Sequence, residues 1–345
     1  MTQAMTRMSM PPPRCTTGFS LVEMMVALAI GALTILALMA LGVSFENDKR
    51  TTTGGGDAQS TGAIALYGLQ RDIRQSGYGI TAPTLTPTLY TCSMTLPSGG
   101  TVPVAPVVVN PATSVIPAGD ANTDTLLVMF GNSNFEPQGN AIAAQSGQNY
   151  TMQMPGSFAI GDEVMAAPDV CAGALLLRPV SAVAATTITA ATGTGSTMYN
   201  LGPSPSVLAY AIRSGRLTVC NYLTTNCGAA TDAATWVPVA DNVVSLRAQY
   251  GVDTTVPMDA TVDAYSQTTP TTACEWARVS AVRLVLVARN SQYSKTGVTS
   301  AAPTWEGSSS VAIDLSGNTE WTHYRYRTLE AIVPIRNVLW LGPVC

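Results

Sequence analysis

The chain has 345 residues, which is enough for one large or two ordinary domains with a substantial core. Only 11% of the residues are charged, 6% are aromatic, and the formal net charge is −4. The 17 Lys and Arg residues are scattered, so no basic stripe suggests a nucleic-acid partner, and the composition disfavours a highly charged cytosolic enzyme.

The first predicted element is a long apolar helix near the N-terminus. Glu23 is the only ionisable residue between Gly18 and Phe45. A helix over residues 19–45 would be roughly 40 Å long, which exceeds the hydrocarbon core of a bilayer at about 30 Å. A carboxylate at the centre of such a span would cost about 2.5–3.5 kcal/mol, and less near its end, so Glu23 indicates a function.

The charges beside this helix predict its orientation. Arg7 and Arg14 precede it without an acid, so the N-terminus is expected in the cytoplasm and the residues from 46 onward outside it. A secretory signal peptide would need a shorter apolar core and a later cleavage site, whereas here the small residue Gly18 lies before the apolar run. The pattern predicts a leader that is cut on the cytoplasmic side of a helix that stays, and an uncleaved anchor is the alternative.

The stretch GFSLVEMMVALAIG, residues 18–31, resembles the class III signal sequence of type IV pilins and pseudopilins. The resemblance implies that a prepilin peptidase cuts after Gly18 and methylates the new N-terminal amine of Phe19. It also implies that Glu23 attracts the N-terminal amine of a subunit already in the filament and so sets the axial register. Pairing of Glu23 with the amine of its own chain is the alternative.

Four later segments resemble PilW-type minor pilins in the same order, namely residues 61–80, 239–253, 276–290 and 323–337. The resemblance implies a pilin-like fold of the α+β class, with a long N-terminal transmembrane helix and a β-rich head built on an antiparallel sheet. It divides the chain into a leader (1–18), a transmembrane and assembly half of the first helix (19–45), a periplasmic half (46–80) and a head (81–345).

The function implied is that of a minor pilin that helps to initiate type IV pilus assembly and lies in the tip complex. Its partners would be the prepilin peptidase, the other minor pilins, the major pilin, the inner-membrane assembly platform and a tip adhesin. The protein would begin as a single-pass inner-membrane protein and end at the pilus tip. The alternatives are a J-type pseudopilin of a type II secretion system and a membrane-anchored periplasmic enzyme, and adhesion, motility and DNA uptake all stay open.

The periplasmic half of the helix is expected to be interrupted near residues 51–57, where three threonines precede Gly54, Gly55 and Gly56. Each glycine disfavours helix by up to about 1 kcal/mol. After that, apolar residues recur at helical spacing and should pack on the head, while the charged residues between them should face elsewhere and two glycines should end the helix. These residues are Leu66, Leu69 and Ile73, then Arg71, Asp72 and Arg74, then Gly77 and Gly79.

From residue 81 onward, Pro, Gly and Thr separate short apolar runs that predict strands. The clearest runs are 243–252 and 277–290, and Ser214-Gly215 predicts a turn between two strands within 206–223. Further strands are expected at 102–109, 125–130, 163–167, 174–180, 186–190 and 328–338. Strands that follow one long helix indicate an α+β head with an antiparallel sheet.

Six cysteines lie beyond the leader, which contains Cys15. In an oxidising compartment they predict structural disulfides. Cys220 and Cys227 are the pair that the sequence favours, because a strand leads there into a short polar loop that returns. The pairing of the other four, Cys92, Cys171, Cys274 and Cys345, stays open.

Catalytic and cofactor motifs are absent from the sequence, so we expect no enzymatic activity, no cofactor and no metal. His323 is the only histidine, and we expect it to serve packing or to lie at the surface. Asp120, Asn122 and Asp124 imitate the start of a calcium loop but lack its glycine. Asp253, Asp259 and Asp263 form a second acidic loop, and in both loops we favour ordinary turn acids over a cation site. Tyr and Arg alternate from Tyr324 to Arg327, which is the pattern expected of an exposed strand.

Overall fold

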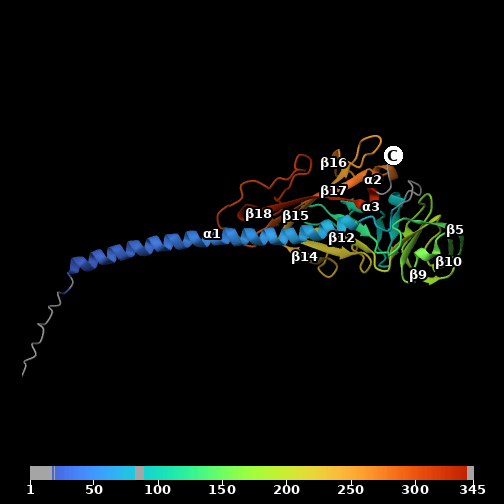
Figure 1. Ribbon diagram of the computed structural model, residues 1–345. Helices are drawn as coiled ribbons and strands as arrows, with labels where there is room; N and C mark the ends of the chain where they lie inside the picture. The colour runs from blue at the N-terminus through green and yellow to red at the C-terminus, as the bar shows by residue number, and fades with distance from the viewer. Residues whose placement is uncertain (1–17, 19, 82–88, 340–345) are drawn as a thin grey trace, which may run out of the picture. The chain divides into compact units, whose positions relative to one another are not determined.

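The computed structural model describes residues 18, 20–81 and 89–339, and it consists of a long apolar helix followed by a β-rich head (Figure 1). This arrangement confirms the predicted α+β class, because nearly all strand pairs in the described head are antiparallel. Contacts within the chain divide it into two units, Met1–Thr53 and Gly54–Cys345, and each is described by itself.

Helix α1 runs from Leu21 to Gln75 and passes through residues 51–57 without a break, so the predicted interruption is wrong. The reason is that one of these glycines, Gly54, packs against the head. Gly54 is buried, and a Cβ added there would lie 3.2 Å from the Cβ of Asn290. Contact with the head therefore offsets a propensity cost of up to about 1 kcal/mol per glycine.

The second half of α1 packs on the head as predicted, through the buried side chains of Leu66, Leu69 and Ile73. The prediction that Asp72 faces elsewhere is wrong, because this residue is only 3% exposed. Its Oδ2 atom accepts a hydrogen bond of 2.5 Å from the hydroxyl of Tyr210, and its Oδ1 atom accepts one of 3.0 Å from Nε of Arg71. A buried carboxylate is tolerated when it has such partners, and here they tie the helix to the sheet.

The helix ends where the sequence predicted. Gly77 and Gly79 both have a positive φ, +85° and +82°, which is the left-handed conformation that glycine adopts without strain. Gly79 also allows a close approach, since an added Cβ would lie 3.0 Å from the carbonyl oxygen of Asn200.

A four-stranded antiparallel sheet packs against α1 from Gly54 onward, through the alternate residues Leu284, Leu286 and Ala288. The residues between them, Val285 and Val287, pack on the opposite face in a second core cluster with the loop that precedes the last strand. The strands, in spatial order, are β16 (Ala264–Ser266), β15 (Val243–Val252), β17 (Val279–Arg289) and β18 (Tyr326–Pro334). The two clearest strand predictions are thus confirmed.

A five-stranded antiparallel sheet adjoins it within the same core. The predicted turn is present, with positive φ at Ser214 and Gly215 of 52° and 69°. The strands, in spatial order, are β14 (Val237–Asp241), β13 (Arg216–Asn221), β12 (Ser206–Arg213), β4 (Leu126–Phe130) and β3 (Val107–Val109).

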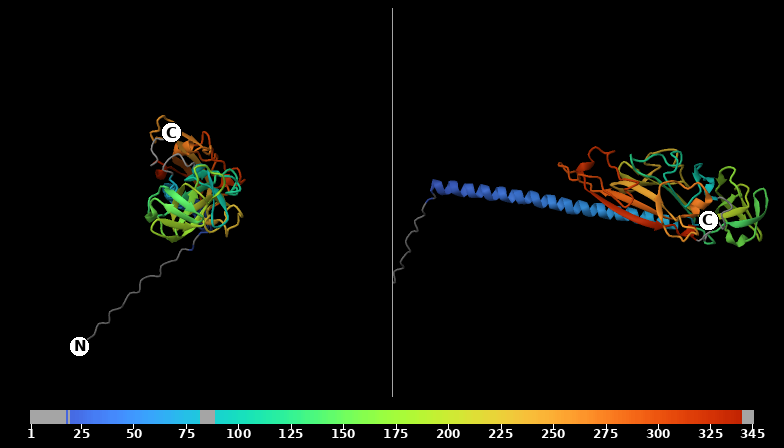
Figure 2. Two further views of the ribbon diagram at one scale, coloured as in Figure 1. Left: turned by 90° about the vertical axis from the view of Figure 1, so that its right-hand side faces the viewer. Right: turned by 90° about the horizontal axis from the view of Figure 1, so that it is seen from above.

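A closed barrel is inserted between β4 and β12. The strands predicted at 163–167 and 186–190 are present in it, but no pattern in the sequence predicted that they close into a barrel. Its interior is a separate core cluster around Tyr150, Phe158 and Met198. Its strands are, in order, β10 (Thr187–Ala190), β6 (Asn149–Met152), β5 (Asn140–Ser146), β11 (Thr197–Gly202), β7 (Glu163–Ala167) and β9 (Arg178–Val183). Figures 1 and 2 show the barrel, in green, at the end of the head where α1 terminates.

The junction between the barrel and α1 is held by hydrogen bonds. The backbone N–H of Gly131 donates to the carbonyl of Tyr78 at 2.7 Å, and the Tyr78 hydroxyl donates to the carbonyls of Ser133 and Phe135 at 2.9 and 2.8 Å. The small elements that complete the described head are β1 (Ser93–Thr95), β2 (Thr101–Pro103), β8 (Leu175–Leu176), α2 (Ala273–Ala277) and α3 (Arg336–Leu339).

The contact at Gly62 predicts an asymmetric effect of mutating the glycines of α1. A Cβ added at Gly62 would lie 2.5 Å from Cδ1 of Leu329 and 3.1 Å from Cβ of Ala288, so Gly62→Leu should lower the free energy of unfolding by ~1–3 kcal/mol. Gly56 is exposed with no atom within 4 Å, so Gly56→Leu should raise it by ~0.5–1 kcal/mol through helix propensity. Urea unfolding of the full-length protein in detergent measures the free energy of unfolding of both variants. Equal changes in this free energy would contradict the packing role of Gly62.

Candidate functional site

The first turn of α1 places Glu23 beside the backbone that precedes the helix. Its Oε2 atom accepts a hydrogen bond of 3.2 Å from the backbone N–H of Ser20, and the Ser20 hydroxyl accepts one of 3.4 Å from the N–H of Val22. The bond from the Ser20 N–H to Glu23 is one half of a capping box, and the Ser20 hydroxyl caps the N–H of Val22 instead of that of Glu23. The sequence signal for this turn, Ser20 followed three residues later by Glu23, was missed. The bond occupies one of the roughly four acceptor positions of the carboxylate, so Glu23 can still bind a cation.

The predicted cleavage point lies immediately before this turn. Gly18 is exposed and has no neighbouring atom within 4 Å of an added Cβ, whereas Phe19 lies outside the described residues. A peptide bond in an exposed segment without secondary structure is accessible to a peptidase.

The helix that follows Glu23 exposes its apolar side chains all around. The stretch Leu21–Gly42 is long and apolar enough to cross a membrane by length and composition, and none of it is buried. Leu21, Leu33 and Leu38, for example, are 76%, 67% and 67% exposed. Such a surface requires lipid or other apolar helices around it.

The head carries a smaller exposed apolar patch on the same helix. Ile64 and Tyr67 are 69% and 68% exposed and are three residues apart, so they lie side by side on the face of α1 that does not contact the sheets. This patch is separate from the apolar stretch Leu21–Gly42, because residues 46–62 between them are mainly polar residues and glycines.

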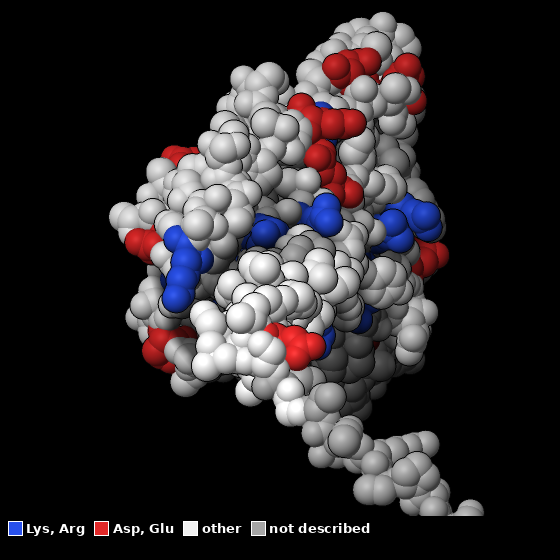
Figure 3. Space-filling model, turned by 90° about the vertical axis from the view of Figure 1, so that its left-hand side faces the viewer, with Lys and Arg blue, Asp and Glu red and all other residues white. Residues whose placement is uncertain are grey.

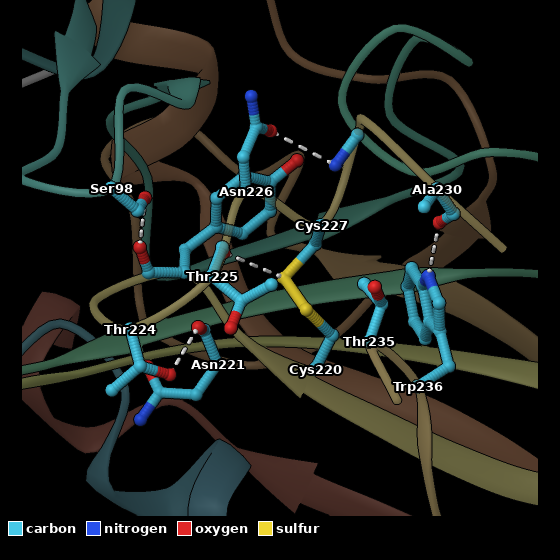
Figure 4. The surroundings of a disulfide bond; sticks show 12 residues. Ser98, Cys220, Asn221, Thr224, Thr225, Asn226, Cys227, Ala230, Thr235 and Trp236 are labelled. Atoms are coloured by element: carbon cyan, nitrogen blue, oxygen red, sulfur yellow. Dashed lines mark hydrogen bonds between the residues drawn. A yellow bond between two sulfur atoms is a disulfide. The ribbon is translucent and has the colours of Figure 1, made fainter. Parts of the chain in front are cut away.

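The cysteines form structural cross-links. Cys220 and Cys227, the pair that the sequence favoured, are joined with their Cα atoms 5.8 Å apart (Figure 4). Cys92 and Cys171, whose pairing was open, are also joined, with Cα atoms 5.6 Å apart. Cys274 is disulfide-bonded, and Cys345 lies outside the described residues.

The disulfide Cys220–Cys227 closes a loop that is docked by aromatic side chains. The hydroxyl of Tyr222 donates to the carbonyl of Val115, and burial raises the pKa of Tyr222 to about 12. The indole of Trp236 donates to the carbonyl of Ala230 at 2.9 Å, beside the disulfide in Figure 4.

The first acidic loop is a buried polar network. Asp124 is 3% exposed and accepts hydrogen bonds from Nη1 of Arg247 and the backbone N–H of Ala248, both at 2.9 Å, and from Nδ2 of Asn110 at 3.0 Å. Asp120 instead accepts from the N–H groups of the turn at Ser214 and Gly215. The two carboxylates therefore serve different parts of the fold.

The second acidic loop organises its own backbone. Asp253 accepts hydrogen bonds from the N–H groups of Asp259 and Ala260 at 2.8 and 2.7 Å. The Thr255 hydroxyl, at 2.7 Å, and these N–H groups hold the pKa of Asp253 below its usual range. Among the described residues, no group of three His, Cys, Asp or Glu side chains is placed to hold a metal ion.

The remaining candidates lie at the start of β18. His323 stacks on Tyr293 with ring centroids 4.8 Å apart and contacts the carbonyl of Ser294 through Nδ1, which is a packing role. In the alternating segment that follows, the hydroxyl of Tyr326 donates to the carbonyl of Trp321 at 2.8 Å, whereas Arg327 is exposed. Only part of that segment is therefore available to a partner.

Comparison with known proteins agrees with these features. Residues 13–43 match the prokaryotic N-terminal methylation motif, and residues 209–337 match the family described as type IV pilus-assembly protein W. Among solved structures, a type IV-like pilin from Thermus thermophilus matches with 13% identity and a TM-score of 0.34, covering 82% of this chain and 97% of that one. No curated protein matches the chain.

The N-terminal motif and the exposed apolar helix are features of the type IV pilin class. Together with the match over residues 209–337, they support a PilW-like type IV pilin. The pilin family implies membrane anchoring, association with a pilus and contact with other pilins and the assembly machinery. The barrel lies outside both matched regions.

The network around Asp124 predicts that this loop stabilises the fold without a cation. Asp124→Ala should lower the free energy of unfolding by ~3–5 kcal/mol, because it leaves the part-buried Arg247 without its carboxylate. Asp259→Ala, which removes an exposed turn acid, should cost less than about 1 kcal/mol. Calcium or a chelator should leave the melting temperature unchanged, and a rise with calcium that Asp124→Ala abolishes would contradict this role.

Proposed function

We propose that this protein is a minor pilin that helps to initiate type IV pilus assembly and lies in the tip complex. The observation that carries the proposal is one helix that combines an exposed apolar surface over Leu21–Gly42 with a single carboxylate, Glu23, in its first turn. The match to the PilW family favours this function over that of a J-type pseudopilin. The role is structural and not enzymatic.

In this proposal the prepilin peptidase removes residues 1–18, and Phe19 becomes the methylated N-terminus. The segment 19–45 lies in the inner membrane, residues 46–80 continue the helix into the periplasm, and the head from residue 81 onward follows it. The N-terminus of the precursor is cytoplasmic, and the mature subunit moves from the membrane into the pilus. Other minor pilins, the major pilin, the assembly platform and a tip adhesin are its proposed partners.

Glu23 is proposed to set the axial register of the subunit. Apolar packing along the helix is favourable at many axial positions, because one Leu or Val surface is much like another. The carboxylate is different, since burying it without a cation is strongly penalised. A neighbouring N-terminal amine supplies that cation at one position, and the hydrogen bond from Ser20 leaves room for it.

The register role predicts a separation of processing from assembly. Glu23→Ala should be cleaved normally, with Phe19 at the N-terminus by intact-mass analysis, but should recover roughly tenfold less of the co-expressed pilins when the full-length protein is purified in detergent. Ser20→Ala is the matched control, because it weakens the cap and leaves the carboxylate in place. Normal recovery of pilins by Glu23→Ala would rule out the register role, and equal losses in both variants would assign Glu23 to capping alone.

A further inference from the structure

A pocket of about 390 Å³ lies at the end of the head where β17 finishes and β18 begins. Its walls come from the turn at Ser214 and Gly215, from Val244 and Arg289, and from the segment between Asp314 and Tyr326. We call it the Arg289 pocket, and no role assigned so far involves it.

Arg289 is a partly buried arginine whose charge is not matched within the head. Its guanidinium lies over the ring of Tyr324, with Cζ 4.5 Å from the ring centroid, and its Nε atom is buried. Within the described part of the chain, no hydrogen bond or ion pair is made by this guanidinium. Partly buried charges are normally paired, so the arginine is complementary to an anion that the chain does not itself supply.

The two acids in the pocket wall are engaged elsewhere. Asp120 accepts hydrogen bonds from the N–H groups of Ser214 and Gly215 at 2.8 and 2.7 Å. Asp314 accepts from the N–H of Ser316 and from Nδ2 of Asn122, both at 2.8 Å. Their negative charges nevertheless remain in the wall, so the pocket disfavours any group that carries more than one negative charge.

We propose that the Arg289 pocket receives the carboxylate of a Glu or Asp side chain from a neighbouring pilin subunit. The planar guanidinium fork of Arg289 fits a carboxylate with two parallel hydrogen bonds. Leu315, Trp321 and Val244 provide apolar walls for the methylene groups of such a side chain. The two wall carboxylates would repel a doubly charged phosphate, but a phosphodiester lipid headgroup carries one charge, as a carboxylate does, so the choice of a protein partner rests on the position of the pocket.

The position of the pocket agrees with a contact between subunits, and the inference rests on the minor-pilin function proposed above. The pocket lies at the end of the head where α1 enters, since Gly54 packs against Asn290 and Gly55 approaches Nη2 of Arg327. Arg325 and Arg327 add positive charge there and have no acidic partner among the described side chains. Figure 3 shows Lys and Arg side chains in this view of the molecule, with Asp and Glu side chains close beside them.

The test uses the full-length protein co-expressed with the major and other minor pilins of the same organism and purified in detergent. Arg289→Gln should recover roughly tenfold less of these pilins, and Arg289→Lys should recover an intermediate amount, because lysine keeps the charge and loses the fork. Arg216→Gln is the matched control: Arg216 lies beside the same turn, but its Nε already pairs with Asp241 at 2.9 Å. It should recover pilins within about twofold of the unmodified chain.

Melting temperatures of the variants separate loss of binding from loss of folding. If Arg289→Gln has a lower melting temperature than the unmodified chain, the salt dependence of pilin recovery by Arg289→Lys decides whether the charge at this position contributes to binding. Equal recovery by Arg289→Gln and the unmodified chain would overturn the inference. Loss of binding to phosphatidylglycerol vesicles by Arg289→Gln with full recovery of pilins would overturn it in favour of a lipid. Failure of the unmodified chain to recover any pilin would instead overturn the proposed function, and the inference with it.

Discussion

An apolar helical surface that its own chain does not cover is the constraint on which the rest of this structure depends. Every large apolar side chain described between Leu21 and Gly42 is exposed, so this stretch is stable only in lipid or among other apolar helices. Among other apolar helices such a surface packs favourably at many axial positions, so apolar packing alone does not specify the register of the subunit. The carboxylate of Glu23 is the group whose energy depends strongly on what lies next to it, and this is the physical basis of the register role that we propose for it.

The same helix changes its role at Gly54 without changing its conformation. Over Leu21–Gly42 its large apolar side chains are exposed, and after Gly54 one face packs into the core of the head through Leu66, Leu69 and Ile73. Glycines at the contact let the helix lie close to the sheet, and the buried bond between Asp72 and Tyr210 fixes its position there. The outward face keeps Ile64 and Tyr67 exposed, so the part of the helix that lies on the head has a small apolar patch of its own.

Local patterns predicted those parts of the fold whose cause is local. Alternating apolar residues predicted β15 and β17, a Ser-Gly pair predicted the hairpin between β12 and β13, and helical spacing predicted the buried stripe of α1.

The predictions failed where a tertiary contact determines the local structure. Gly54 alone favours a break in the helix, but in the structure it packs against Asn290. Asp72 alone favours contact with solvent, but in the structure it accepts a hydrogen bond from Tyr210. Two strands of the barrel, at 163–167 and 187–190, were predicted, but its closure was not, because closure depends on pairing between segments that are distant in the sequence. Among the site residues, Ser20 was predictable from its spacing to Glu23, whereas the Arg289 pocket exists only where three strand ends and a loop meet.

The most direct test of the central claim is the structure of the native pilus tip by electron cryo-microscopy. The account predicts that the carboxylate of Glu23 lies within about 4 Å of the N-terminal amine of a neighbouring subunit, with the apolar side chains of Leu21–Gly42 covered by neighbouring helices. A carboxylate that contacts only the amine or the Ser20 backbone of its own chain, with no cation from a neighbour, would contradict it.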